Sequence, residues 1–242
     1  MPLGYGVLSS GNIDSNLSGG IVQVSVFKEW GGTTQDVSRL IERCRDMGLR
    51  YVIHPVGYYL SETREHERAQ TLDFLRRLAE MSPDAIIVHD EGAPWGARLE
   101  GIFERCYVRA VEELSTICRV SIENAHNTPD IRWFWGRYAA SITLDIGHVE
   151  AAGINSIEFV NTLDNETIEK IDFVHIHKCN GKRSDGSNDH WGLDDQCREL
   201  HALRQLLKRK KSAGIIVEVV EHDQILNTLK LIEPLMMEEQ CS

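Results

Sequence analysis

Short apolar runs rich in valine and isoleucine recur along the whole chain, and helical patterns separate most of them. Runs that are apolar at nearly every position are typical of parallel strands covered on both faces. Repeated alternation of such strands with helices predicts an α/β fold. We therefore expect eight strands, at residues 3–8, 21–27, 51–56, 85–90, 119–125, 141–147, 173–178 and 214–220.

Two helical patterns illustrate the alternation, and both follow the i, i+3, i+4 spacing of an amphipathic helix. The first ends before Gly48 and comprises Val37, Leu40, Ile41, Cys44 and Met47. The second comprises Leu99, Ile102, Phe103, Cys106, Ala110 and Leu114.

Two α/β architectures fit this pattern: an open doubly wound sheet and a closed barrel. No glycine-rich phosphate loop follows the first run, which disfavours a dinucleotide-binding open sheet. A length of 242 residues suits a barrel, and no linker-like stretch divides the chain. We therefore predict one domain over residues 1–242, an α/β fold of the (β/α)8 TIM-barrel type with parallel strands. The lack of a helical pattern between the first two runs is its one irregularity.

Ionisable residues stand where six of the apolar runs end. The carboxyl ends of all strands in a barrel converge on one face, where active sites lie. Each residue alone is explained as a hydrogen-bonded histidine or a partner of an arginine. Together, buried carboxylates and imidazoles predict a divalent cation, because unpaired buried charges are costly. The six residues are His54, His89, Glu123, Asp145, His177 and Glu218.

The run at 141–147 continues into "ITLDIGHVEAAG", which presents Asp145 and His148 three residues apart. We expect Asp145 to bind the metal at the end of the strand. His148 would reach the same site, at the carboxyl ends of the strands, as a second ligand or a substrate contact, with Gly147 leaving room for the turn.

Four segments in this order, "SIENAHN", "TLDIGHVEAAG", "FVHIHK" and "IIVEVVE", resemble the xylose-isomerase-like TIM-barrel superfamily. The resemblance spans about Tyr51 to Glu221. The superfamily contains sugar isomerases and epimerases, inosose dehydratases, and the endonuclease IV type of abasic-site nuclease (AP endonuclease family 2).

Resemblance to the epimerase branch implies one divalent metal, with its glutamates moving protons to and from the substrate. The implied ligands are Glu123, Asp145, His177 and Glu218, and the implied catalytic residues are Glu123 and Glu218. His148 and His190 would face the substrate. Lys178 would touch an anionic substrate or point outward from its strand, and Trp95 and Trp191 would form an aromatic wall in the loops.

Resemblance to the nuclease branch implies a trinuclear zinc site. The matching residues are His54, His89, Glu123, Asp145, His148, His177, His190 and Glu218. Asn188 stands where that branch has an aspartate, and Asp194 stands where both branches have a glycine. Both departures from the family pattern lie in the loop around His190, which would bind the substrate.

Charge and cysteine content bear on partners and location. The net charge of −11 disfavours a long phosphate backbone as partner, so nucleic acid is not expected, and the basic cluster at 208–211 is interpreted as a solvated helix end. The six cysteines form no CxxC pair and the sequence shows no signal pattern, so we expect the protein in the cytoplasm. No apolar run is long enough to span a membrane, so we expect no membrane partner. A homodimer is the default oligomer.

The expected function is a metal-dependent isomerase or epimerase of a small sugar, polyol or sugar phosphate. Two alternatives stay open: an endonuclease IV-like zinc phosphodiesterase, and a barrel that binds a ligand or metal without turnover. The expected cofactor is a divalent metal, Mn, Zn or Co, with Mg also compatible with these ligands.

Overall fold

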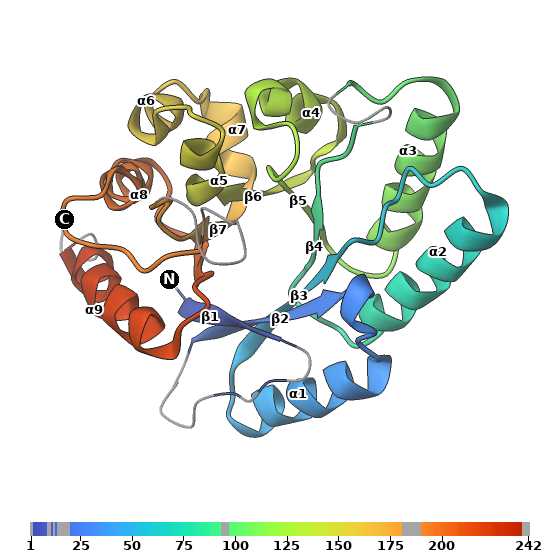
Figure 1. The fold of residues 1–242 in the computed structure, drawn as a ribbon, viewed down its shortest axis with the longest axis horizontal. Coiled ribbons are helices and arrows are strands. Elements are labelled where there is room, and N and C mark those ends of the chain that lie inside the picture. Colours follow the sequence, from blue (N-terminus) through green and yellow to red (C-terminus); the bar gives the residue numbers. More distant parts are fainter. Residues whose placement is uncertain are drawn as a thin grey trace.

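The computed structural model describes residues 2–8, 11, 13, 20–92, 97–180 and 190–238. Within this part of the chain the eight predicted runs form a closed barrel, in which every strand runs parallel to its neighbours and β8 returns to β1 (Figure 1). The strands are β1 (Leu3–Leu8), β2 (Ile21–Phe27), β3 (Arg50–Val56), β4 (Ile86–His89), β5 (Val120–Glu123), β6 (Ser141–Asp145), β7 (Ile171–Ile176) and β8 (Gly214–Val217). The predicted barrel is therefore confirmed.

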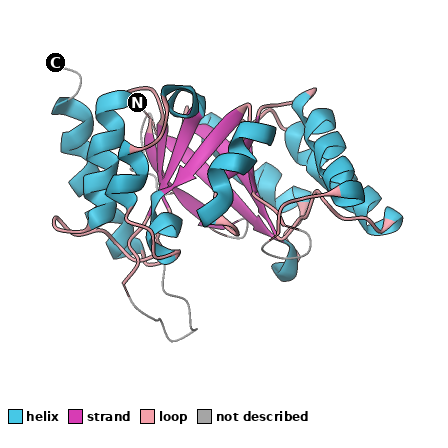
Figure 2. Cartoon of the chain, turned by 90° about the horizontal axis from the view of Figure 1, so that it is seen from above, coloured by secondary structure: helices cyan, strands magenta, loops and turns pink. Residues whose placement is uncertain are grey.

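Helices surround the barrel and face the outside of its strands (Figures 1 and 2). They are η1 (Lys28–Trp30), α1 (Thr34–Asp46), α2 (Glu65–Ala79), α3 (Gly101–Ser115), η2 (Thr128–Asp130), α4 (Ile131–Tyr138), α5 (Ile146–Ala151), α6 (Ser156–Asn161), α7 (Asn165–Lys170), α8 (Arg198–Arg209) and α9 (His222–Glu238). Among these helices, none has both the length and the apolar character needed to cross a membrane.

The two helical patterns behave differently in the structure. α1 buries Val37, Leu40, Ile41 and Cys44, as its spacing predicts. In the second pattern, the buried residues differ from the predicted ones. α3 begins at Gly101, so Leu99 precedes it, and Ile102 and Phe103 lie exposed on its outer side. Its buried face is formed by Tyr107, Ala110 and Leu114.

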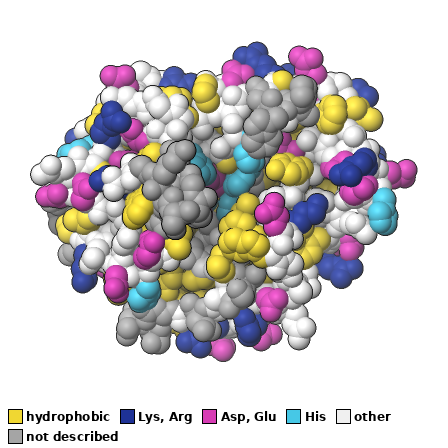
Figure 3. All heavy atoms as spheres, in the orientation of Figure 1, with side chains coloured by type: hydrophobic (Ala, Val, Ile, Leu, Met, Phe, Trp, Pro, Cys, Tyr) yellow, Lys and Arg dark blue, Asp and Glu magenta, His cyan; other side chains and the backbone are white. Residues whose placement is uncertain are grey.

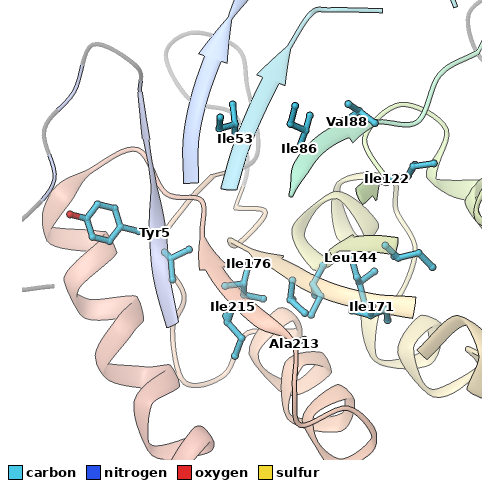
Figure 4. Packing of buried hydrophobic residues seen from close by; sticks show 14 of the residues in the cluster. Tyr5, Ile53, Ile86, Val88, Ile122, Leu144, Ile171, Ile176, Ala213 and Ile215 are labelled. Atoms are coloured by element: carbon cyan, nitrogen blue, oxygen red, sulfur yellow. The ribbon is translucent and has the colours of Figure 1, made fainter. Parts of the chain in front are cut away.

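Side chains alternate between the two faces of each strand, which divides the core in two. Outward residues such as Ile53, Ile122 and Leu144 pack between the barrel and its helices (Figure 4). A smaller inward cluster closes the interior at the end where the strands begin, and it comprises Ile21, Val52, Ala85, Ile87, Phe173 and Ile216. Because inward positions recur every second residue, the next inward side chains lie nearer the carboxyl ends of the strands.

The basic cluster at 208–211 differs from the predicted solvated helix end. Arg209 donates hydrogen bonds to the carbonyl oxygens of Val160 (2.9 Å) and Leu163 (2.8 Å). Lys210 is buried, and its Nζ donates to the carbonyl oxygen of Glu169 at 2.6 Å. Two of the four cations therefore attach the end of α8 to the α6–α7 segment by donating hydrogen bonds to its backbone carbonyl groups.

Candidate metal centre

The second inward layer of the barrel is polar. On β7, for example, Phe173 belongs to the apolar inward cluster, and the inward position that follows it is His175. The same step leads from Val52 to His54 on β3 and from Ile216 to Glu218 beyond β8. Histidines gather in a hollow at the centre of the face in Figure 3, next to hydrophobic side chains. The layer lies at the carboxyl ends of the strands, as predicted.

A first group of ligands combines Glu123, Asp145, His175 and Glu218. His175 Nδ1 lies 3.2 Å from Glu123 Oε1, 3.5 Å from Glu218 Oε1 and 4.0 Å from Asp145 Oδ2. Glu218 is further oriented by the buried Gln23, whose Nε2 donates to Glu218 Oε1. Three carboxylates and one imidazole around one point are a ligand set for a divalent cation.

The net charge of this group depends on whether His175 carries a second proton on its ring. Burial lowers the pKa of His175, but Glu218 and Glu123 outweigh it and raise that pKa to about 10. Burial raises the pKa of Glu218, but His175, His54 and His190 outweigh it and lower that pKa to about 2. Without a metal, protonated His175 is thus the cation among the carboxylates. A divalent ion would displace this proton, since only neutral imidazole binds metal.

A second group comprises His54, His89 and Glu123. His54 Nδ1 donates to the carbonyl oxygen of Ile87 at 3.0 Å, so its Nε2 carries no proton and accepts a hydrogen bond from His89 Nε2 at 3.1 Å. The same nitrogen of His54 lies 3.5 Å from Glu123 Oε2. His89 Nε2 lies 3.7 Å from the same oxygen. Burial, followed by the neighbouring histidines, lowers the pKa of His89 well below its usual value, so His89 is neutral. A metal at its Nε2 would replace the proton that this nitrogen donates to His54, and the ring proton would then be on Nδ1.

Glu123 connects these two groups. Its Oε1 faces His175 and its Oε2 faces His54 and His89. A carboxylate with one oxygen in each of two ligand groups is suited to bridge two metal ions. Glu123 lies at the end of β5 in register with His89 on β4, so the barrel itself fixes this arrangement.

A third group comprises His148, His177 and His190. His148 Nδ1 donates to the carbonyl oxygen of Asn124 at 3.0 Å, and His190 Nδ1 donates to that of Glu218 at 2.9 Å. His177 is engaged differently, because its Nδ1 accepts a hydrogen bond from the backbone N–H of His190 at 3.0 Å.

Unsatisfied polar atoms concentrate in this layer. Among the described residues, nine buried side-chain nitrogen or oxygen atoms have no hydrogen-bond partner, and all but those of Tyr107 and Glu113 belong to it. They include both carboxylate oxygens of Glu123 and both ring nitrogens of His175. Because an unpaired buried polar atom is costly, this pattern fits a site built to hold cations.

Two carboxylates next to His89 hold the surrounding loops. Asp90 accepts hydrogen bonds from the backbone N–H groups of Ala125 (2.6 Å), His126 (2.7 Å) and Asn127 (2.8 Å). Glu91 accepts hydrogen bonds from the backbone N–H groups of Leu60 (2.6 Å) and Ser61 (2.9 Å), which fixes the position of the loop after β3. The sequence prediction did not include this pair, although "HDE" at a strand end was the available signal.

Most of the predicted site residues come together in the structure. The residues in the three groups are His54, His89, Glu123, Asp145, His148, His177, His190 and Glu218, with His175 in addition. The grouping differs at one position, because His175 rather than His177 lies with the three carboxylates. The signal for His175 was available, since "FVHIHK" places both histidines on the same face of β7.

The predicted loop residues are placed less clearly. Lys178 Nζ binds Asp194 Oδ2 at 2.5 Å, and its backbone pairs with Trp191 in an isolated bridge. Asp194, which stands in the place of an expected glycine, is therefore the partner of this lysine. Trp95 and the neighbourhood of Asn188 lie outside the described residues. A substrate contact through Lys178, Trp95 or Trp191 stays a prediction.

No protein-family model matches the sequence, and no curated protein does either. Several solved structures match the whole barrel. Endonuclease IV from Thermus thermophilus gives a TM-score of 0.66 at 18% identity, covering 98% of this chain and 100% of that one. The IOLI protein, solved with a zinc atom, gives 0.61 at 14% identity, covering 99% and 96%. A D-psicose 3-epimerase solved with D-fructose gives 0.55 at 12% identity, covering 99% and 95%. The chain has the fold of the xylose-isomerase-like TIM barrels.

Proposed function

We propose that the chain is a metal-dependent phosphoester hydrolase that binds two divalent ions bridged by Glu123. The observation that carries this proposal is the position of Glu123, with one oxygen in each of two ligand groups. Paired ions supply electrostatic stabilisation of the attacking and leaving oxygens in displacement at phosphorus. The similarity to an endonuclease, whose substrates are phosphodiesters, supports this reaction class.

The chain's own residues would divide the work. His54 and His89 would hold one ion, and Asp145, His175 and Glu218 would hold the other. His148 and His190 use Nδ1 for backbone carbonyl groups, and we propose that their Nε2 atoms face an oxygen of the substrate. The carbonyl contacts also fix both rings, so that a phosphate would meet oriented groups.

Zinc is the metal that we propose. Two histidines and a carboxylate form a ligand set that suits zinc, and the second group has this composition. The similarity to the zinc-bound IOLI protein supports the same ion. Manganese and cobalt accept the same ligands. The net charge of −11 favours a small or short phosphodiester over a long duplex.

A sugar isomerase or epimerase is the second candidate. Glu123 Oε1 and Glu218 Oε1 lie 3.2 and 3.5 Å from the same nitrogen of His175, so two glutamates flank one ion position, as proton transfer requires. The similarity to a D-psicose 3-epimerase supports this candidate. It requires only the first ligand group, however, and gives the buried His54 and the half-buried His89 no part in metal binding.

The test is the metal content per chain of protein purified without chelator, followed by activity assays. We expect about two zinc ions per chain and hydrolysis of bis(4-nitrophenyl) phosphate, with short oligonucleotides containing an abasic site as the second substrate. One ion per chain with turnover of ketohexoses would establish the isomerase instead. A chain that takes up no metal on titration would refute both enzymes and leave the binding barrel.

A further inference from the structure

We infer that His177 is a positioning residue, a neutral histidine whose Nε2–H holds Asp145 in place, and that it does not bind a metal itself. The inference rests on the proposed metal centre but not on the proposed reaction. It gives His177 a different role from His148 and His190, although the three residues lie together in one ligand group.

The hydrogen bond at Nδ1 determines the tautomer of His177. The backbone N–H of His190 points at Nδ1 from 3.0 Å, and a backbone amide can only donate. Nδ1 is therefore the bare nitrogen of the ring. Since a neutral imidazole carries one proton, that proton is on Nε2. A protonated nitrogen has no lone pair to offer a metal ion, whereas Nδ1 is already engaged.

The proton on Nε2 faces Asp145. Nε2 lies 3.2 Å from Asp145 Oδ1, although the N–H is not aligned well enough to count as a hydrogen bond. Oδ1 also accepts the backbone N–H of His148 at 2.7 Å. Asp145 Oδ2, which has no hydrogen-bond partner, is directed to the first ligand group. Donors on one oxygen thus leave the other oxygen for the ion, as is usual for a carboxylate ligand with supporting groups.

The surrounding residues prevent the ring from turning. His177 is fully buried. A Cβ atom on Gly147 would lie 2.2 to 2.5 Å from three of its ring atoms, so this ring packs directly on the glycine backbone. A half-turn of the ring would place a carbon against the His190 N–H and remove this hydrogen bond. His190 itself has a φ of 57°, a left-handed conformation that is uncommon for a non-glycine residue.

This assignment removes His177 from the third group as a ligand. The other two members of that group, His148 and His190, stay candidates for a metal or for an oxygen of the substrate.

A matched pair of variants tests the inference. In H177Q the side-chain amide keeps a donor near the position of Nε2, and in H177L a side chain of similar size has none; neither variant offers an imidazole. We expect about two zinc ions per chain in the wild type and in H177Q, with affinities within about threefold of each other. In H177L we expect the affinity for one ion to fall by roughly 10- to 100-fold, the usual loss when a supporting group of a metal ligand is removed. Three ions in the wild type, with one lost in both variants, would overturn the inference.

A second measurement does not depend on the folding of H177L. Long-range ¹H–¹⁵N NMR spectra of the zinc-loaded protein distinguish the two tautomers of each histidine, and H177Q identifies the signals of His177. We expect a proton on Nε2 of His177, and a bare or metal-bound Nε2 would overturn the inference. If the chain binds zinc and shows this tautomer without hydrolysing phosphodiesters, the proposed reaction fails while the role of His177 stands.

Discussion

Replacement of Gly147 by alanine tests the geometry of the site most directly. The added Cβ atom would lie 2.2 Å from Cε1 of His177, 2.3 Å from Nδ1 and 2.5 Å from Nε2. Carbon atoms pack at about 3.5 to 4.0 Å, so the ring must move by more than about 1 Å. A movement of this size would disturb the contact between Nε2 and Asp145 Oδ1, which now lie 3.2 Å apart.

The expected loss of stability combines two contributions. Overpacking of a core costs about 1 to 3 kcal/mol, and three ring atoms in contact place this variant in the upper half of that range. Alanine in a helix is favoured over glycine by about 0.5 to 1 kcal/mol, and Gly147 lies in α5. We therefore expect G147A to lower the free energy of unfolding by about 1 to 2.5 kcal/mol.

Gly136 supplies the matched control. It lies in α4, is exposed, and a Cβ atom there would meet nothing within 4 Å. G136A should therefore be neutral or stabilising by up to about 1 kcal/mol. The assay is urea unfolding of the metal-free chains, followed by zinc titration of each variant. The reasoning is refuted if G147A matches G136A in stability and the wild type in zinc affinity.

Two further predictions concern Glu123 and Cys44. E123Q should reduce bound zinc from about two ions per chain to less than one by elemental analysis, because Glu123 is shared by both ligand groups; loss of a single ion would contradict the bridging role. Burial raises the pKa of Cys44 to about 11, so at pH 8 only about one thiol in a thousand is ionised. Iodoacetamide should therefore spare Cys44 in the native chain and modify it in urea, as measured by peptide mass spectrometry; equal labelling in both states would argue against this burial.

The barrel was predictable because its strands are apolar on both faces and end at ionisable residues. The pattern of α1 was interpreted correctly for a similar reason, since four of its apolar positions are buried against the barrel. The pattern of α3 failed at Ile102 and Phe103, which are apolar but exposed. Spacing gives the angular position of a side chain around a helix, but not where the neighbouring strands cover that helix.

The choice between His175 and His177 shows a second limit. Alternation predicts which face of β7 a residue occupies, and both histidines occupy the inward face. Depth within the barrel depends instead on register between strands. His175 is level with Asp145 on β6 and with Ile216 on β8. Such pairings bring together residues far apart along the chain, and nothing in the local sequence of β7 encodes them.

Loop contacts were least predictable. Lys178 was expected near a substrate, but its partner is Asp194, sixteen positions further along the chain. Asp90 and Glu91 hold loops that follow β5 and β3, which no local pattern connects to β4. These contacts depend on loop conformations, and a loop conformation is determined by the whole rim of the barrel rather than by its own residues.

The nature of the ion pairs argues against a barrel that binds a ligand without a metal. Such a protein would neutralise its buried carboxylates with arginine or lysine, whose charges are permanent near neutral pH. Among the described residues, the ion-pair partners of Glu123, Asp145 and Glu218 are instead histidines. Imidazole can release its proton and bind a metal through the same nitrogen. A site in which every cationic partner can be exchanged for a metal ion, and in which neither oxygen of Glu123 has a hydrogen-bond partner, suits exchange of protons and metal better than permanent neutralisation.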